Sequence, residues 1–135
     1  MPPPSEIEQF AALRLFAEGA GAYPIEAYEF VHRGLAFTVG KVHGSATPPA
    51  RDRHVTGQQL CQGLREYALG LWGRMARTVL QHWNITGTID FGRIVFELIE
   101  HKILAATEQD RIEDFRDVYD FKTALETEYR IASHK

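Results

Sequence analysis

Two pairs of arginines are the residues of this chain best suited to binding a polyanion. Arg74 and Arg77 lie one turn apart in an expected helix, and Arg51 and Arg53 lie in the segment expected to form a neighbouring loop. Side chains three positions apart on a helix share a face, and guanidinium groups bind phosphates. One interpretation is a nucleic-acid-binding face. The other, which we prefer, is that these arginines keep a helix pair soluble and form ion pairs with the acidic end of the chain.

Six carboxylates lie close together in the C-terminal third, at Glu108, Asp110, Glu113, Asp114, Asp117 and Asp120. A calcium loop of the EF-hand kind needs a glycine for its sharp turn, and no glycine lies between residues 107 and 121. The remaining interpretations are a solvated hairpin edge, protected by charge from strand addition, and an acidic docking surface. We therefore expect no metal site here.

Tyr119 and Phe121 alternate with charged residues in the same stretch. Core packing is the simplest role for such aromatic side chains. An exposed pair edged by Asp117 and Asp120 would instead form a protein-docking element, because aromatic anchors dominate interfaces. Asp117, Tyr119 and Phe121 are therefore candidate binding residues.

Residue types that support catalysis form no recognisable constellation. The six histidines show no metal-ligand spacing, and the chain has no nucleophile elbow, phosphate-cradling glycine loop or dinucleotide fingerprint. Cys61 lies beside Leu60 and Leu64 in an apolar stripe, so we expect it to be buried and unreactive. We expect no catalytic residue, no metal and no cofactor.

The net charge of -3 hides an uneven distribution. Residues 51–84 carry five arginines against two acidic side chains, whereas residues 100–135 carry six basic against nine acidic side chains. The helix that would enter a DNA groove offers Arg93 as a further candidate binding residue, but it also carries Asp90 and Glu97. Carboxylates are unfavourable next to phosphates, which makes nucleic acid the second choice of partner.

Apolar spacing and capping residues predict the helices that would position these side chains. A proline-rich leader at residues 1–5 precedes a first helix that ends near Gly19. Pro24 then suits the first turn of a long amphipathic helix that continues to Val42. Residues 44–54 contain two prolines, and we expect them to form an exposed loop.

The C-terminal half is predicted to contain three helices, a β-hairpin and a final helical segment. Thr56 and Gln59 form a capping-box pattern at the start of a helix that Gly73 ends. Thr88 is expected to cap a later helix. The elements after Gly73 are expected at Arg74–Trp83, Thr88 to about Lys102, Ile103–Phe121 (the hairpin) and Lys122–Ala132.

Two details of packing follow from these helices. Gly63 and Gly70 are seven residues apart and predict a close helix–helix approach. The short helix at Arg74–Trp83 is expected to bury either Met75 or Ala76, together with Val79 and Trp83.

The order helix, helix, turn, helix and hairpin over residues 56–121 is typical of a winged helix-turn-helix. Arg74–Trp83 would be the supporting helix, Thr88–His101 the recognition helix and Ile103–Phe121 the wing. The predicted fold class is therefore mainly α with a small β-hairpin. We expect one helical domain over residues 1–135, a length that can bury a core, with a winged-helix-like C-terminal half.

Four segments resemble a family of small bacterial proteins with no assigned function: Tyr23–Tyr28 (YPIEAY), His54–Gln58 (HVTGQ), Ile89–Phe96 (IDFGRIVF) and Glu113–Phe121 (EDFRDVYDF). The similarity spans most of the chain after the leader. The resemblance implies a single-domain bacterial protein, and it brings no catalytic or binding residues to this sequence.

The chain has no apolar run of the roughly 20 residues that a membrane span needs, and its first residues lack the pattern of a secretory signal. We therefore expect a cytoplasmic protein with no membrane partner. The predicted function is a non-catalytic binding or adaptor protein that docks on another protein or on a larger assembly, such as a ribonucleoprotein. The alternatives are a nucleic-acid-binding regulator that uses the four arginines and, third, a small enzyme. No oligomeric state is predicted.

Overall fold

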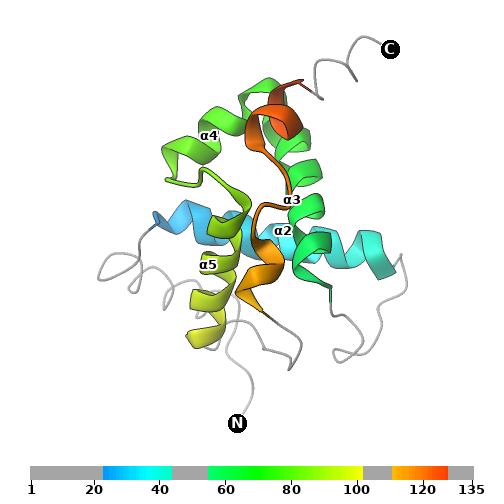
Figure 1. Ribbon diagram of the computed structural model, residues 1–135, viewed down its shortest axis with the longest axis vertical. Helices are drawn as coiled ribbons and strands as arrows, with labels where there is room; N and C mark the ends of the chain where they lie inside the picture. Colours follow the sequence, from blue (N-terminus) through cyan, green and yellow to red (C-terminus); the bar gives the residue numbers. More distant parts are fainter. Residues whose placement is uncertain (1–22, 44–54, 102–110, 128–135) are drawn as a thin grey trace.

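The computed structural model describes residues 23–43, 55–101 and 111–127, whose arrangement is shown in Figure 1. These residues form helices and turns, with no strand among them, which confirms the mainly helical class. The elements in chain order are α2 (Ile25–His43), α3 (Gly57–Trp72), η2 (Gly73–Met75), α4 (Ala76–His82), α5 (Thr88–Glu100), η3 (Ile112–Phe115) and η4 (Lys122–Thr127). The predicted leader, first helix and loop at 44–54 lie outside the described residues.

Helix α3 begins and ends as the sequence predicts. The hydroxyl of Thr56 accepts a hydrogen bond from the Gln59 N–H at 3.1 Å, and the side-chain oxygen of Gln59 accepts one from the Thr56 N–H at 2.9 Å. This capping box satisfies two backbone N–H groups that the helix itself leaves unpaired. At the other end Gly73 has a φ of 52°, and its N–H donates to the Leu69 carbonyl. Glycine adopts such a positive φ without a steric penalty.

The backbones of α2 and α3 approach each other closely at Gly63. A Cβ on Gly63 would lie 1.9 Å from the Thr38 hydroxyl oxygen and 2.7 Å from the Thr38 Cβ. Thr38 is buried, and its hydroxyl donates to the Gly34 carbonyl at 2.7 Å. The predicted close approach is therefore confirmed at Gly63. It is wrong at Gly70, which is exposed and has no neighbouring atom within 4 Å of where its Cβ would be.

The short helix after Gly73 forms in two parts, η2 and α4. Ala76 is fully buried, whereas Met75 is 57% exposed, so Ala76 is the buried member of the predicted pair. Trp83 is half-buried, and its ring packs edge-on against Trp72 with the centroids 5.3 Å apart. This contact holds the end of α4 against the end of α3.

Helix α5 is capped by Asp90 and not by Thr88. One carboxylate oxygen of Asp90 accepts hydrogen bonds from the N–H groups of Thr86 at 2.9 Å and Gly87 at 3.1 Å. Thr88 is instead the first residue of the helix, and its hydroxyl accepts a bond from the Val118 N–H at 3.1 Å. The predicted Thr88 cap is wrong because the helix already begins at Thr88, and the Asp90 N–H, which a Thr88 cap would bind, donates to the Gly87 carbonyl.

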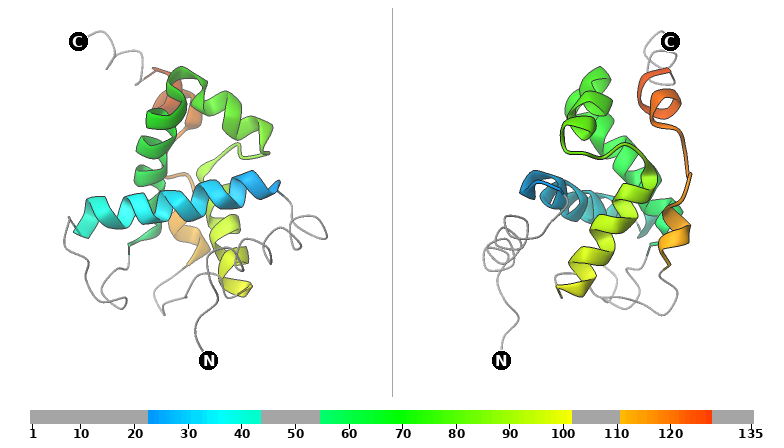
Figure 2. Two further views of the ribbon diagram at one scale, coloured as in Figure 1. Left: turned by 180° about the vertical axis from the view of Figure 1, so that it is seen from behind. Right: turned by 60° about the vertical axis from the view of Figure 1, so that its left-hand side comes forward.

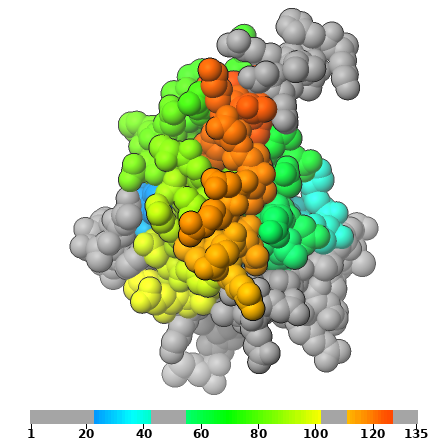
Figure 3. Space-filling view, in the orientation of Figure 1, coloured from blue at the N-terminus to red at the C-terminus, as the bar shows by residue number. Residues whose placement is uncertain are grey.

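Residues 111–127, which we call the C-terminal strap, correct the predicted hairpin. They form the 3-10 turn η3, a run of further turns and the π-helical segment η4. The strap runs across one face of α3 and α5 (Figures 1 and 3). The final helical segment is thereby confirmed over Lys122–Thr127.

The hairpin fails because the backbone of the strap finds its hydrogen bonds without a second strand. The N–H groups of Asp114 and Arg116 bond three residues back within the strap, and the Val118 N–H bonds to α5. Phe115 and Phe121 are both buried, so their spacing reflects two anchors in the core and not a pleated strand. The winged helix-turn-helix prediction is therefore wrong over the described part of its wing, and Ile103–Ala106 lies outside the described residues.

An aromatic cluster joins α2 to the other helices. The ring of Phe30 lies between 5.2 and 6.4 Å, centroid to centroid, from the rings of Tyr67, Trp72, Trp83 and Phe91. Figure 2 shows that α2 crosses the back of the other described helices. Its inner side therefore packs on the core while its outer side faces away. None of the described helices is both long and apolar enough to cross a membrane.

Candidate binding surface on helices α2 and α3

The structure describes two of the four arginines on which the nucleic-acid interpretation rests, Arg74 and Arg77. Arg77 on α4 pairs with Glu126 of η4, with 3.2 Å between Nη1 and Oε1. This is an ion pair with the acidic end of the chain, as the simpler interpretation predicts for Arg77. Arg74 is exposed in η2, and Arg51 and Arg53 lie outside the described residues. A basic face formed by all four arginines therefore stays a prediction.

The candidate binding residues of the strap lie mostly against the core. Phe121 is 4% exposed, and its ring packs on Phe91 with the centroids 5.7 Å apart. Tyr119 is half-buried, and its hydroxyl donates to the Cys61 carbonyl at 2.6 Å. Core packing is thereby confirmed, and an exposed aromatic docking element at Phe121 is wrong, because the strap lies flat on α3 and α5. Asp117 is exposed in a turn with a φ of 50°.

Two tyrosines, Tyr23 just before α2 and Tyr28 in its first turn, bond to carboxylates of α5. The Tyr23 hydroxyl donates to Asp90 at 2.6 Å, and the Tyr28 hydroxyl donates to Glu97 at 2.5 Å. Burial, together with these bonds, raises the pKa of both phenols above the ordinary value. Arg93 is exposed and donates to the same oxygen of Asp90 at 3.2 Å. We call the Tyr23–Asp90 and Tyr28–Glu97 hydrogen bonds together the tyrosine clasp. Both bonds join residues of the protein to each other.

Cys61 is buried in the core, as the apolar stripe predicts. Burial raises the pKa of its thiol to about 12, so the thiol stays protonated and poorly nucleophilic at neutral pH. Within the described ranges, no three or more histidine, cysteine or acidic side chains gather in a way that could hold a metal ion. Every buried polar side-chain atom in these ranges has a hydrogen-bond partner.

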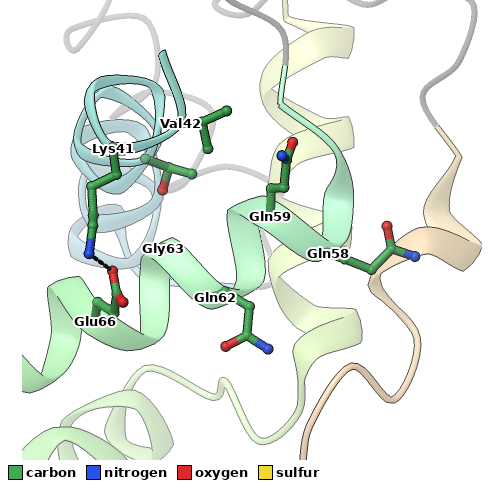
Figure 4. A pocket seen from close by; sticks show the side chains of 8 residues that line it. Lys41, Val42, Gln58, Gln59, Gln62, Gly63 and Glu66 are labelled. Carbon is green, nitrogen blue, oxygen red and sulfur yellow. Dashed lines mark hydrogen bonds and ion pairs between the residues drawn. The ribbon is translucent and has the colours of Figure 1, made fainter. Parts of the chain in front are cut away.

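An open groove lies between the end of α2 and the start of α3. It has a volume of about 320 Å³ and is lined by Thr38, Lys41, Val42, Gln58, Gln59, Gln62, Gly63 and Glu66. Figure 4 shows Val42 on the α2 wall and the glutamines along α3. Lys41 and Glu66 form an ion pair that bridges the two walls. The missing side chain at Gly63 lets the helices meet at the floor of the groove.

An apolar surface continues from this groove along both helices. Phe37 lies one turn before Lys41, is 37% exposed and packs on Tyr67 with the ring centroids 5.4 Å apart. Leu71 follows Tyr67 one turn later on α3 and is 52% exposed, and Met75, in η2 beyond the end of α3, is 57% exposed. We call the groove and these apolar residues together the α2–α3 surface.

Periodicity alone does not single out this surface. Phe37 and Leu71 continue the apolar sides of their helices, so by pattern both belong to the core. A usable signal is the pair Gly40 and Gly70, which lie inside helices although no neighbouring atom comes within 4 Å of where their Cβ atoms would be. Glycine is unfavourable inside a helix, and a close packing contact is the usual reason for keeping one there. Gly40 and Gly70 make no such contact, so packing within the protein does not explain them.

No protein-family model, curated protein or solved structure matches this chain. The resemblance to small bacterial proteins therefore stays a prediction.

Proposed function

We propose that this protein is a non-catalytic adaptor that docks on another protein through the α2–α3 surface. One observation carries the proposal. The four large hydrophobic side chains that stand most exposed in the described part of the chain, Phe37, Val42, Leu71 and Met75, all lie on α2, α3 and η2. Apolar residues gathered on one surface and rimmed by polar side chains are characteristic of protein interaction sites.

Two further features support docking over nucleic-acid binding. Lys41, which lines the groove, is neutralised by Glu66, and a carboxylate beside a phosphate backbone is unfavourable. Arg77 is likewise engaged with Glu126. The arginine-based regulator therefore stays the second candidate. We further propose that the adaptor works in the cytoplasm.

Site-specific photo-crosslinking in native cytosol tests the proposed function. The photoreactive p-benzoylphenylalanine is placed at position 37 or 71 on the surface, and at position 81, an exposed site on α4, as the control. We expect protein adducts from positions 37 and 71 that are absent from position 81 and that survive nuclease treatment. Adducts that nuclease removes would favour the nucleic-acid regulator, and equal labelling at all three positions would refute docking through this surface.

A further inference from the structure

Two arginines lie at the margins of the α2–α3 surface. Arg33 is exposed on α2, one turn before Phe37, and Arg74 is exposed in η2 between Leu71 and Met75. Neither forms an ion pair or hydrogen bond with another described residue, in contrast to Lys41. The guanidinium groups of Arg33 and Arg74 are therefore available to pair with carboxylates of a partner, and both residues are near exposed apolar residues in the chain.

The outer sides of the two helices also carry very small residues. Ala36 and Gly40 are exposed on α2, and Gly70 is exposed near the end of α3, four residues before Arg74 in the sequence. The space around Gly40 and Gly70 is open to at least 4 Å from where their Cβ atoms would be. This leaves room for the backbone of a partner element to approach both helices closely.

We propose that the α2–α3 surface binds an amphipathic α-helix of a partner protein, with acidic residues along the edge of its apolar stripe. The apolar stripe contacts Phe37, Leu71 and Met75, and the carboxylates pair with Arg33 and Arg74. This inference rests on the proposed function and names the partner class of the same surface.

A helix fits this surface better than an extended peptide. Extended peptides bind mainly through backbone hydrogen bonds to the edge of a sheet, and the described residues contain no strand. The backbone groups of α2 and α3 are already paired within their helices, so a partner gains affinity through side chains. Apolar residues spaced along one helix face supply such anchors at intervals of three and four positions.

Selection from a displayed library tests the partner class directly. The library presents 18-residue peptides of helix-forming composition with variable apolar, acidic and basic positions. It is selected in parallel against the wild-type protein, the double variant Arg33→Glu/Arg74→Glu, and the control Arg116→Glu, which changes an exposed arginine of the strap. Dissociation constants of enriched peptides are then measured by fluorescence anisotropy at low and high salt.

We expect the wild type and the Arg116→Glu control to enrich acidic peptides with apolar residues at helical spacing. The double variant is expected to bind these peptides at least tenfold more weakly and to enrich basic ones. The reason is that the charges at positions 33 and 74 are reversed. Wild-type enrichment of basic, uncharged or non-helical peptides would overturn the inference, as would equal binding by wild type and double variant.

The crosslinking result separates this inference from the proposed function. If positions 37 and 71 crosslink to protein while the library shows no acidic preference, docking stands and the partner class is wrong. Self-association of the wild type, detected by light scattering and lost in Phe37→Asp, would identify a second copy as the occupant and also overturn the inference.

Discussion

Thr38 sets how closely α2 approaches α3. Its hydroxyl bonds to the Gly34 carbonyl, and its Cβ would lie 2.7 Å from a Cβ on Gly63. Rotation about the Thr38 side chain cannot move that carbon, so only glycine fits at position 63. At Gly34 the closest atom is the end of the Leu64 side chain, which can turn away. The two glycines thus differ in how strictly the contact requires them.

Replacing glycines of α3 by alanine is expected to have opposite effects at two positions. Gly63→Ala should lower the free energy of unfolding by about 1–3 kcal/mol, the usual cost of overpacking. Gly70→Ala should raise it by about 0.5–1 kcal/mol, since alanine is the better helix former and meets no neighbour. Urea denaturation followed by circular dichroism measures both. A similar loss of stability at the two positions would contradict the packing at Gly63.

At the scale of elements, α2 is joined to α5 by the tyrosine clasp as well as by the aromatic cluster. Tyr23 and Tyr28 are buried, and both donate to carboxylates, so their neutral forms are favoured in the folded protein. Asp90 also caps α5, so one side chain fixes both the start of a helix and its contact with α2. Ionisation of these phenols would break the clasp.

The clasp predicts that alkaline pH destabilises the protein. Unfolded tyrosines ionise near pH 10, whereas the pKa values of Tyr23 and Tyr28 are raised in the folded state. The folded state then holds protons that the unfolded state releases, so stability from these groups is complete below pH 10 and falls as pH rises above it. Each tyrosine contributes up to about 1.4 kcal/mol per pH unit in that range.

The measurement is urea denaturation from about pH 8 to about pH 11, the upper part of which covers tyrosine ionisation. The double variant Tyr23→Phe/Tyr28→Phe should show a shallower alkaline slope than the wild type. Cys61 and Tyr119, whose pKa values are also raised, stay in both proteins, so the difference in slope reports the clasp. Parallel slopes would show that the two phenols do not bond to carboxylates in solution.

Across the whole molecule, the C-terminal strap completes a core that the helices alone leave open. Phe121 packs on Phe91 of α5, Leu125 is buried, and the Ala124 carbonyl accepts from Arg65 of α3 at 3.0 Å. The strap therefore contributes to the same hydrophobic core as α2, α3 and α5. Loss of its anchors should loosen the whole described core and not the strap alone.

Phe121→Ala is expected to lower the free energy of unfolding by about 3–5 kcal/mol, as other large-to-small substitutions of buried aromatics do. Lys122→Ala, at the exposed neighbouring position, should change it by no more than about 0.5 kcal/mol. Amide hydrogen exchange should show faster exchange in α2 and α5 as well as in the strap. Faster exchange confined to residues 111–127 would contradict a shared core.

The sequence predicts the features that depend on residues only a few positions apart in the chain. The capping box of Thr56 and Gln59, the positive φ of Gly73 and the burial of Cys61 each follow from local chemistry or helical periodicity. The predicted cap of α5 is wrong because the spacing of the residues does not fix whether the helix begins before or after Thr88; it begins at Thr88, and Asp90 accepts from the N–H groups that precede it. The hairpin was wrong because alternating apolar residues fit either a pleated strand or an irregular segment with spaced anchors.

The sequence by itself determined a mainly helical protein, the ends of α3 and the apolar sides of its helices, because these depend on spacing and on contacts a few residues apart. Only the tertiary structure decided which apolar residues stay outside the core. Phe37 and Leu71 belong to the same stripes as buried residues, and their exposure depends on how α2 crosses α3 at Gly63. Burial depends on contacts with residues of other elements, and helical periodicity gives no information about those contacts.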